Sequence, residues 1–326
     1  MNLNQVGRTN VLVSALGFGG APIGNLFKSV SDEEASGAVV AAWEAGVRYF
    51  DTAPHYGLGL SELRLGRTLA AQHRIDYVIS TKVGRLLTPN PRPVGSDLES
   101  GGFAVRDDLT RTLDYSADGV KRSIEESLQR LSMDYVDIVY VHDPDDHVDQ
   151  VIRETFPALI TLREEGVVRA VGAGMNYWSP LLQFVQACDI DLVMLAGRWT
   201  LLDRSGLPLL EACAQRNVAV VAAGPFNSGI LSHAEPKPDD HFDYQTVSPE
   251  RFAKATALAA LCNNYEVELP RAAVQFPLRH EAVVSVVAGV RNEFQARTSV
   301  DWMGTNIPTA LWEELESFDE GPASRP

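Results

Sequence analysis

The sequence predicts a single α/β domain, residues 1–326, folded as a closed (β/α)8 TIM barrel. Eight short runs rich in β-branched residues recur along the chain, with helical stretches between them. The runs are apolar throughout rather than alternating, which is typical of parallel strands covered on both faces. A length of 326 residues is ordinary for one such barrel with insertions. Closure into a barrel also accounts for eight strand–helix alternations better than an open sheet does.

The strands can be placed from the apolar runs. We expect them, in chain order, within residues 13–20, 47–53, 77–84, 136–143, 167–174, 192–198, 218–224 and 283–290. An open doubly wound sheet is the alternative arrangement. Its phosphate-binding Gly-x-Gly-x-x-Gly turn is not convincingly present, because Gly17, Gly19 and Gly20 lack that spacing. They also lack the acidic partner that follows about 20 residues later in that fold.

The helices carry recognisable start signals. Ser31, with Glu34 three residues on, forms a capping-box pattern before an apolar helical stretch. Ser248 and Pro249 supply an N-cap and a first-turn proline for a later helix. Two further amphipathic stretches, each followed by a strand, cover residues 118–131 and 148–165.

Two long insertions interrupt this rhythm, residues 85–115 after the third strand and residues 224–246 after the seventh. Loops of this length are uncommon in compact domains unless they are functional or disordered. Both leave the carboxyl ends of strands, the face on which barrel enzymes place their active sites. We therefore expect both insertions to cover an active site.

The composition excludes several classes of function. The formal charge is 28 − 43 = −15, and such an acidic chain lacks the basic patches that nucleic-acid or anionic-membrane binding requires. No apolar run approaches the roughly 18 to 20 residues that span a bilayer, and MNLNQVGRTN does not resemble a secretory signal. Cys188, Cys213 and Cys262 have the spacing of neither a disulfide framework nor a zinc site. We expect a cytoplasmic protein without a metal.

Ionisable residues stand where the second, third and fourth strands stop. Asp51, Lys82 and His142 end three apolar runs, and Tyr56 follows Asp51 by five residues. In a closed barrel these strand ends are neighbours on one rim. We therefore expect the four side chains to converge, whereas His55 and His147 are expected to be ordinary loop residues.

The four side chains are suited to moving one proton at a carbonyl or alcohol carbon. A tyrosine hydroxyl titrates near 10 when unperturbed, and a nearby ammonium lowers its pKa. Asp51 would hold Lys82 in place and keep it protonated, and His142 can donate a hydrogen bond to the reacting oxygen. Because none of these groups carries a hydride, the set implies a nicotinamide cofactor.

Segments along nearly the whole chain resemble the aldo-keto reductase family. They are LGFGG (16–20), FDTAPHYG (50–57), SELRLGRTL (61–69), STKVG (80–84), SLQRLSMDYVDIVYVHDPD (127–145) and GVVRAVGAGMN (166–176). The resemblance places Asp51, Tyr56, Lys82 and His142 on the catalytic tetrad, with Tyr56 as general acid or base. FGGAPIGN, the insertion after KVGR, HDPDDH and AGRWTLLD are most similar to the subgroup of L-fucose or D-threo-aldose 1-dehydrogenases and pyridoxal 4-dehydrogenase.

The resemblance also implies a cofactor site. Asn176 matches the residue that holds the nicotinamide carboxamide, and the remaining matches are Pro225, Phe226, Asn227, Ser228 and Gly229 around the pyrophosphate and Gly289, Arg291 and Gln295 near the adenosine phosphate. Ala196 and Ala223 replace the glutamine and the stacking tyrosine of many members. Gly289 and Gln295 replace the lysine and arginine that bind the 2′-phosphate of NADP, so NAD is the expected cofactor. Arg291 and Arg297 could restore NADP binding.

The expected reaction is oxidation of an aldose at C1 to the lactone. Reduction of an aldehyde or ketone, or oxidation of pyridoxal, would use the same residues, and the direction stays open. A non-catalytic cofactor-sensing subunit is a remote alternative that the intact tetrad disfavours. A metal hydrolase is disfavoured because no His-x-His pair lies on a strand and the acidic stretch at Asp143, Asp145 and Asp146 is typical of a solvated loop. The sequence carries no signal for the oligomeric state.

Overall fold

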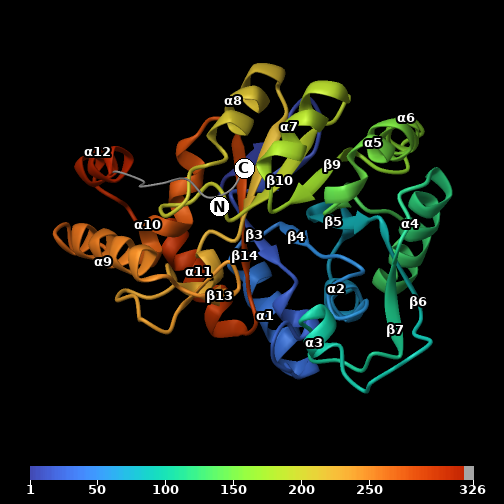
Figure 1. Ribbon diagram of the computed structural model, residues 1–326, viewed down its shortest axis with the longest axis horizontal. Coiled ribbons are helices and arrows are strands. Elements are labelled where there is room, and N and C mark those ends of the chain that lie inside the picture. Colours follow the sequence, from blue (N-terminus) through green and yellow to red (C-terminus); the bar gives the residue numbers. More distant parts are fainter. Residues whose placement is uncertain (319–326) are drawn as a thin grey trace.

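Eight parallel strands close a barrel in the computed structural model, which describes residues 1–318 (Figure 1). The predicted fold class is therefore confirmed, and the tail GPASRP lies outside the described residues. Strand β14 pairs with β3 through Val286 and Leu16, which closes the ring. The barrel strands are β3 (Leu16–Gly19), β4 (Tyr49–Asp51), β5 (Val78–Val83), β8 (Ile138–His142), β9 (Ala170–Met175), β10 (Leu192–Ala196), β11 (Ala219–Ala223) and β14 (Val283–Gly289).

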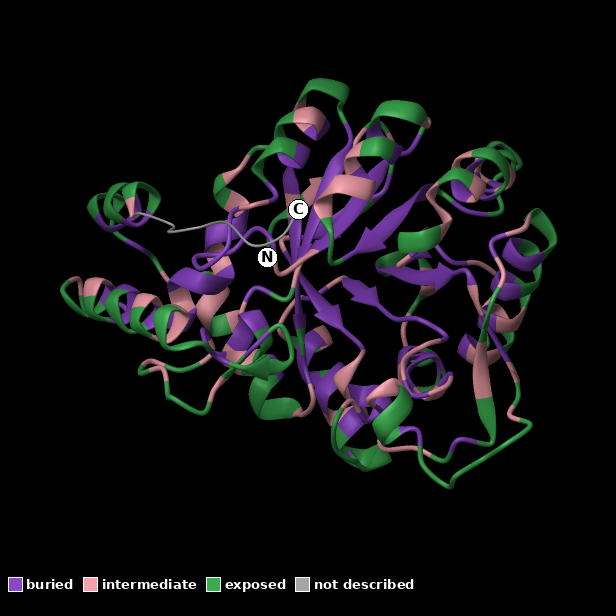
Figure 2. Ribbon diagram, in the orientation of Figure 1, coloured by how far each residue is buried: buried purple, intermediate pink, exposed green. Residues whose placement is uncertain are grey.

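Helices surround the barrel and bury their inner faces against it, as the purple strands and green outer helix faces of Figure 2 show. The capping box of Ser31 and Glu34 opens the first of them, and Ser248 caps α9, both as predicted. The α-helices are α1 (Asp32–Glu44), α2 (Leu60–Leu69), α4 (Ala117–Leu131), α5 (Val148–Gln150), α6 (Phe156–Glu164), α7 (Trp178–Ala187), α8 (Leu207–Arg216), α9 (Pro249–Asn263), α10 (Leu269–Gln275), α11 (Glu293–Gly304) and α12 (Thr309–Ser317). Short 3-10 turns are η1 (Pro22–Gly24), η2 (Arg74–Asp76), η3 (Asp145–His147), η5 (Asn227–Gly229) and η6 (Phe276–Arg279).

The stretch predicted as one helix over residues 148–165 is not regular. A π-helical turn, Val151–Thr155, separates α5 from α6. Pro157 stands in the first turn of α6, where its missing N–H cannot donate to the preceding turn. The backbone therefore changes its hydrogen-bonding pattern just before the proline.

An N-terminal hairpin plugs the amino end of the barrel, a feature that the sequence did not predict. It consists of β1 (Leu3–Gln5) and β2 (Leu12–Ser14), and it buries Val6, Val11 and Val13 against barrel residues such as Ile138 and Tyr140. The predicted strand over residues 13–20 is thus two strands. The hydroxyl of Ser14 bonds to the carbonyl of Leu16, and the chain changes direction between them.

Both long insertions are ordered and lie at the carboxyl ends of the strands. The first forms an antiparallel hairpin, β6 (Arg85–Pro89) with β7 (Leu109–Leu113), and a short helix, α3 (Leu98–Gly101). The second contains β12 (His241–Phe242) and β13 (Gln245–Thr246). Each reaches the segment that follows β3, the first by a bridge between Phe103 and Leu26 and the second by Tyr244 against Phe27. Both insertions therefore contact the loop that follows β3 at the rim of the barrel.

Candidate active site

Three of the four residues predicted to converge end or nearly end their strands. Asp51 is the last residue of β4, Lys82 is the fifth of six in β5, and His142 is the last of β8. Since β4, β5 and β8 are hydrogen-bonded neighbours, their ends form one arc of the rim. Tyr56 comes from the loop between β4 and α2.

A buried ion pair joins the first two of these residues. The Nζ of Lys82 lies 2.9 Å from Oδ1 and 2.7 Å from Oδ2 of Asp51, and it donates a third bond, 2.9 Å long, to the carbonyl of Thr52. Burial alone lowers the pKa of Lys82, but Asp51 and Tyr56 outweigh it and raise that pKa above its ordinary value. Lys82 is therefore an ammonium at neutral pH, as expected.

Hydrogen bonds from side chains in the barrel interior fix the carboxylate of Asp51. The hydroxyl of Ser80 donates to Oδ1 over 2.7 Å. Tyr49 lies 3.1 Å from Ser80 and 3.1 Å from the hydroxyl of Tyr140. All of these side chains are fully or almost fully buried. The carboxylate that orients Lys82 is thus itself fixed by the barrel core.

Tyr56 lies between the ammonium and the imidazole. The Nζ of Lys82 is 4.7 Å from the centroid of the Tyr56 ring, and the His142 ring is 5.8 Å from it and almost perpendicular. Burial raises the pKa of Tyr56, Lys82 lowers it, and the net result is a pKa of about 12. The expected effect of Lys82 is present, but the expectation that the pKa falls below 10 is wrong because desolvation is the larger effect.

Two glycines fix the loop that carries Tyr56. Gly57 has a φ of +65°, and a Cβ there would lie 2.2 Å from the carbonyl oxygen of Gly24. A Cβ on Gly24 would in turn lie 2.8 Å from the backbone of Tyr56. The two loops can approach this closely only because both positions are glycine.

His142 is a neutral imidazole. Burial is the main reason that its pKa lies well below 6.5, and the cations of Arg85 and Lys82 add to it. Its Nδ1 is buried without a hydrogen-bond partner in residues 1–318, and its Nε2 lies 3.6 Å from Asp143. A neutral imidazole has one N–H to donate, which is what a developing negative oxygen requires.

Residues of the first insertion and of the Tyr56 loop complete this part of the site, although no sequence pattern predicts them there. Arg85 pairs with Asp143 at 2.9 Å, so Asp143 is not the solvated loop residue that was expected. His55 lies against the rings of Tyr56, His142 and Phe103. The only sequence signal for a role of His55 was its position directly before Tyr56.

Each cation near the tyrosine has its own carboxylate. Lys82 pairs with Asp51, Arg85 with Asp143, and Arg111 with Asp97. With both histidines neutral, these three ion pairs and two imidazoles carry no net charge together. The arrangement suits a neutral polar molecule better than a phosphorylated or carboxylated one.

The residues predicted to hold a cofactor lie on the opposite arc of the rim. Asn176 follows β9 and is exposed, residues 225–229 follow β11, and Gly289 ends β14. Asn227 and Ser228 have positive φ, and Asn227 Oδ1 is buried without a partner in the described chain. A tight turn with an unsatisfied amide oxygen fits an extended polar cofactor.

Ala196 and Ala223 are directly opposite each other in the pairing of β10 with β11. Two small side chains thus stand side by side at neighbouring strand ends. In strand order both positions lie next to the predicted pyrophosphate turn, which follows β11.

The two arginines predicted near the adenosine phosphate, Arg291 and Arg297, both have hydrogen-bond or ion-pair partners already. Arg291 donates to the carbonyls of Leu26 and Lys28, and its backbone N–H donates to the side chain of Gln295. Arg297 pairs with Glu293 and Glu44. Burial lowers the pKa of Arg291, and Glu34 opposes this effect, so a carboxylate also lies near.

Two other findings bear on the classes of function. No helix among residues 1–318 is long and apolar enough to cross a bilayer. In the same part of the chain, no group of three His, Cys, Asp or Glu side chains could hold a metal ion.

Comparison with known proteins gives a consistent match. The model of the aldo/keto reductase family matches residues 15–320. A D-threo-aldose 1-dehydrogenase from a Pseudomonas species is 46% identical, with 93% of each chain covered. A pyridoxal 4-dehydrogenase from Microbacterium luteolum is 40% identical, with 96% of each covered. An aldo-keto reductase from Bacillus halodurans, solved in its holo form, shares the fold with a TM-score of 0.80 at 24% identity, over 99% of this chain and 98% of that one.

Proposed function

The chain belongs to the aldo/keto reductase family and is an NAD(P)-dependent oxidoreductase, and we propose that it oxidises an aldose at C1 to the lactone. The observation that carries the proposal is the convergence of Tyr56, His142 and the Lys82–Asp51 pair at one rim of the barrel. The 46% identity to a D-threo-aldose 1-dehydrogenase supports the choice of substrate class.

Each of the four residues has a separate proposed role. Tyr56 accepts the proton of the anomeric hydroxyl in oxidation and returns it to the carbonyl oxygen in reduction. Lys82 lowers the free energy of the phenolate, Asp51 fixes Lys82, and His142 donates a hydrogen bond to the reacting oxygen. When bound, NAD(P) supplies the hydride exchange. Its proposed contacts are Asn176, residues 225–229, Gly289, Arg291 and Gln295.

The balance of charges in the site supports a neutral polyhydroxylated substrate. Lys82, Arg85 and Arg111 are each matched by a carboxylate, so none is left to bind a phosphate. Sugar hydroxyls can use the donors of this rim without bringing a charge of their own. The 40% identity to a pyridoxal 4-dehydrogenase supports pyridoxal as the alternative substrate.

A substrate screen tests this proposal. The purified protein should reduce NAD when given L-fucose, D-arabinose or L-galactose, and this can be followed by the absorbance of the reduced nicotinamide. Turnover of pyridoxal alone would replace the aldose proposal by its alternative. If no substrate reacts although NAD binds, the protein is a cofactor-sensing subunit and the proposal is wrong.

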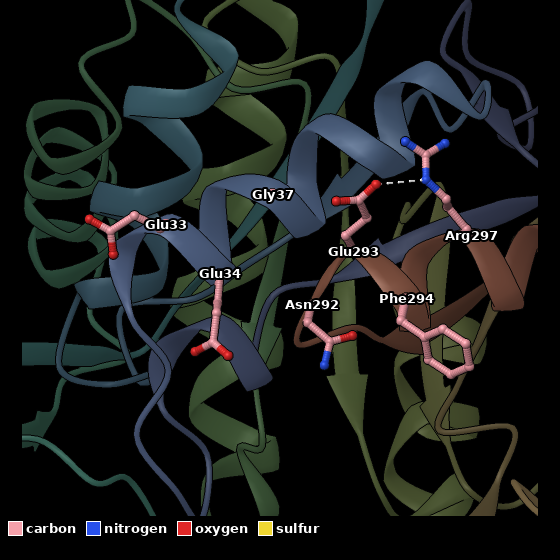
Figure 3. Close-up of a pocket in the computed structure, with 7 residues that line it drawn as sticks. All are labelled: Glu33, Glu34, Gly37, Asn292, Glu293, Phe294 and Arg297. Carbon is pink, nitrogen blue, oxygen red and sulfur yellow. Dashed lines mark hydrogen bonds and ion pairs between the residues drawn. The ribbon is translucent and has the colours of Figure 1, made fainter.

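We propose that the chain prefers NAD over NADP because of the charges near the adenosine phosphate. A cavity of about 640 Å³ lies beside the adenosine-phosphate segment, between the first turns of α1 and α11. Figure 3 shows Glu33 and Glu34 on one side of it and Glu293, paired with Arg297, on the other. A 2′-phosphate here would face three carboxylates, and the arginine that lines the cavity, Arg297, is already paired.

NAD is expected to bind at least about tenfold more tightly than NADP, because charge-assisted bonds to the 2′-phosphate are missing. Quenching of the intrinsic fluorescence during titration measures both Kd values. Replacing both Glu33 and Glu293 by glutamine should reduce the ratio of the Kd for NADP to the Kd for NAD. Glu316→Gln, on distant α12, should leave this ratio unchanged. Equal or tighter binding of NADP to the unaltered protein would contradict the proposed cause.

We also propose that residues 1–326 form one domain and that the protein works in the cytoplasm. The family model covers residues 15–320, which supports one domain. Cys188, Cys213 and Cys262 are all free thiols, which supports a reducing compartment.

A further inference from the structure

His55 is a hydrogen-bonding side chain that the proposed roles leave unused, although it lies beside Tyr56. Its ring is 6.0 Å from the ring of Tyr56 and 5.5 Å from that of His142, measured between centroids. Its Nδ1 is buried and has no hydrogen-bond partner in the part of the chain that the structure describes. A buried polar atom without a partner costs free energy, and a ligand hydroxyl that reaches Nδ1 would recover it.

His55 is uncharged over the whole physiological range. Burial is the largest reason that its pKa falls to about 2, followed by the cations of Arg111, Arg85 and Lys82. The neutral ring has one nitrogen that donates and one that accepts. A hydroxyl group, which also donates and accepts, is its natural partner.

The first insertion fixes His55 through the backbone. Arg111 of β7 donates from Nη2 to the carbonyl of His55 over 3.0 Å. The same guanidinium forms a two-point bond with the nearly buried carboxylate of Asp97, at 2.6 and 2.7 Å. Phe103 packs edge-on against the His55 ring at 5.2 Å. Three residues of the insertion therefore determine where this imidazole stands.

Gly101 shows how tightly the anchor is built. A Cβ at this position would lie 2.3 Å from Oδ2 of Asp97 and 2.4 Å from Nη1 of Arg111. The carboxylate and the guanidinium thus fill the space beside Gly101, so a side chain at this position would displace one of them.

We propose that His55 binds the hydroxyl on the carbon next to the reacting carbon, and that Arg111 with Asp97 positions it for this role. The proposal rests on the proposed function, because it takes the reacting oxygen to lie between Tyr56 and His142. His142 then forms a hydrogen bond with the reacting oxygen, and His55 forms one with the oxygen on the neighbouring carbon. The substrate class is aldehydes and cyclic sugars that carry a hydroxyl at this second carbon.

A matched pair of small aldehydes tests the role of His55. Lactaldehyde and propionaldehyde differ only in the hydroxyl on the second carbon, and both can be reduced with NADH. The ratio of their kcat/KM values should fall about tenfold in His55→Phe, which keeps the ring but loses the hydrogen bond. His55→Asn, whose amide can replace Nδ1, should recover part of the ratio. His147→Phe, a histidine that packs on Tyr115, is the control.

A second set of variants tests the positioning by Arg111. Arg111→Met should lower the same ratio, and adding it to His55→Phe should lower the ratio no further, because Arg111 acts through His55. Arg106→Met, on the same insertion but exposed, is the control. NAD affinity, measured by fluorescence, should stay the same in every variant, which separates this role from misfolding.

The outcomes distinguish the two proposals. A ratio in His55→Phe within twofold of the original, with both aldehydes reduced, overturns only the role of His55. If the double variant lowers the ratio of kcat/KM values by the product of the two single effects, Arg111 does not act through His55 and its positioning role is wrong. If the unaltered protein reduces neither aldehyde and oxidises no sugar, the proposed function fails, and the role of His55 fails with it.

Discussion

Tyr56→Phe is expected to lower kcat by about 10²- to 10⁴-fold, the usual contribution of a positioned acid or base. Phenylalanine keeps the ring that packs against His142 and under the ammonium of Lys82, and it removes only the hydroxyl. KM and the affinity for NAD should therefore change little. Steady-state kinetics with the best substrate of the screen, together with a fluorescence titration of NAD, measure both parts of this prediction.

Tyr77→Phe is the matched control for this experiment. Tyr77 is also largely buried, but its hydroxyl contacts Met133 on the outer side of the barrel. Its loss should leave kcat within about twofold of the original value. If Tyr56→Phe retains a tenth or more of the original kcat, another group moves the proton and the role assigned to Tyr56 is wrong.

The fold and the convergence of the tetrad residues could be predicted because both follow from the apolar runs. Asp51, Lys82 and His142 each interrupt such a run near its carboxyl end. Parallel strands in a closed barrel bring these ends to one rim, whatever the loops between them do. Positions set by strand order can be read from a sequence, since they need no knowledge of side-chain packing.

Features that depend on solvent exclusion or on distant contacts could not be predicted. The sequence places a lysine near Tyr56, but it does not say how completely water is excluded, and burial decides the sign of the pKa shift. The role proposed for His55 depends on Arg111, which lies 56 residues away. That contact needs the pairing of Leu87 with Arg111 in β6 and β7, and no pattern within an irregular, proline-rich insertion indicates this register.

The N-terminal hairpin was missed for a related reason. Val11 and Val13 alternate with exposed residues, but the run is too short to be distinguished from the start of β3. Only the closed barrel creates the apolar end that Val6, Val11 and Val13 cover. Tertiary burial, rather than local propensity, makes this segment a hairpin.

Lys82→Met is expected to have the largest effect on stability, about 3–5 kcal/mol, because it leaves the carboxylate of Asp51 buried without its counter-ion. Both side chains are almost inaccessible, so water cannot replace the lost ammonium. Asp51 would keep the bond from Ser80, whereas the carbonyl of Thr52 would lose the donor Nζ. Urea unfolding at neutral pH measures the change, and Lys121→Met on the exposed face of α4 is the control.

The double variant Asp51→Leu/Lys82→Met separates the cost of an unpaired charge from the value of the pair. Removing both charges should restore part of the free energy of unfolding, because no buried charge is then left without a partner. Activity should not return, since Tyr56 has lost the ammonium that lowers its pKa. A double variant that is less stable than Lys82→Met would contradict this account, because the pair would then contribute more to the fold than its desolvation costs. A double variant that is inactive but more stable than the unaltered protein would mean that the buried pair is retained for catalysis and not for stability.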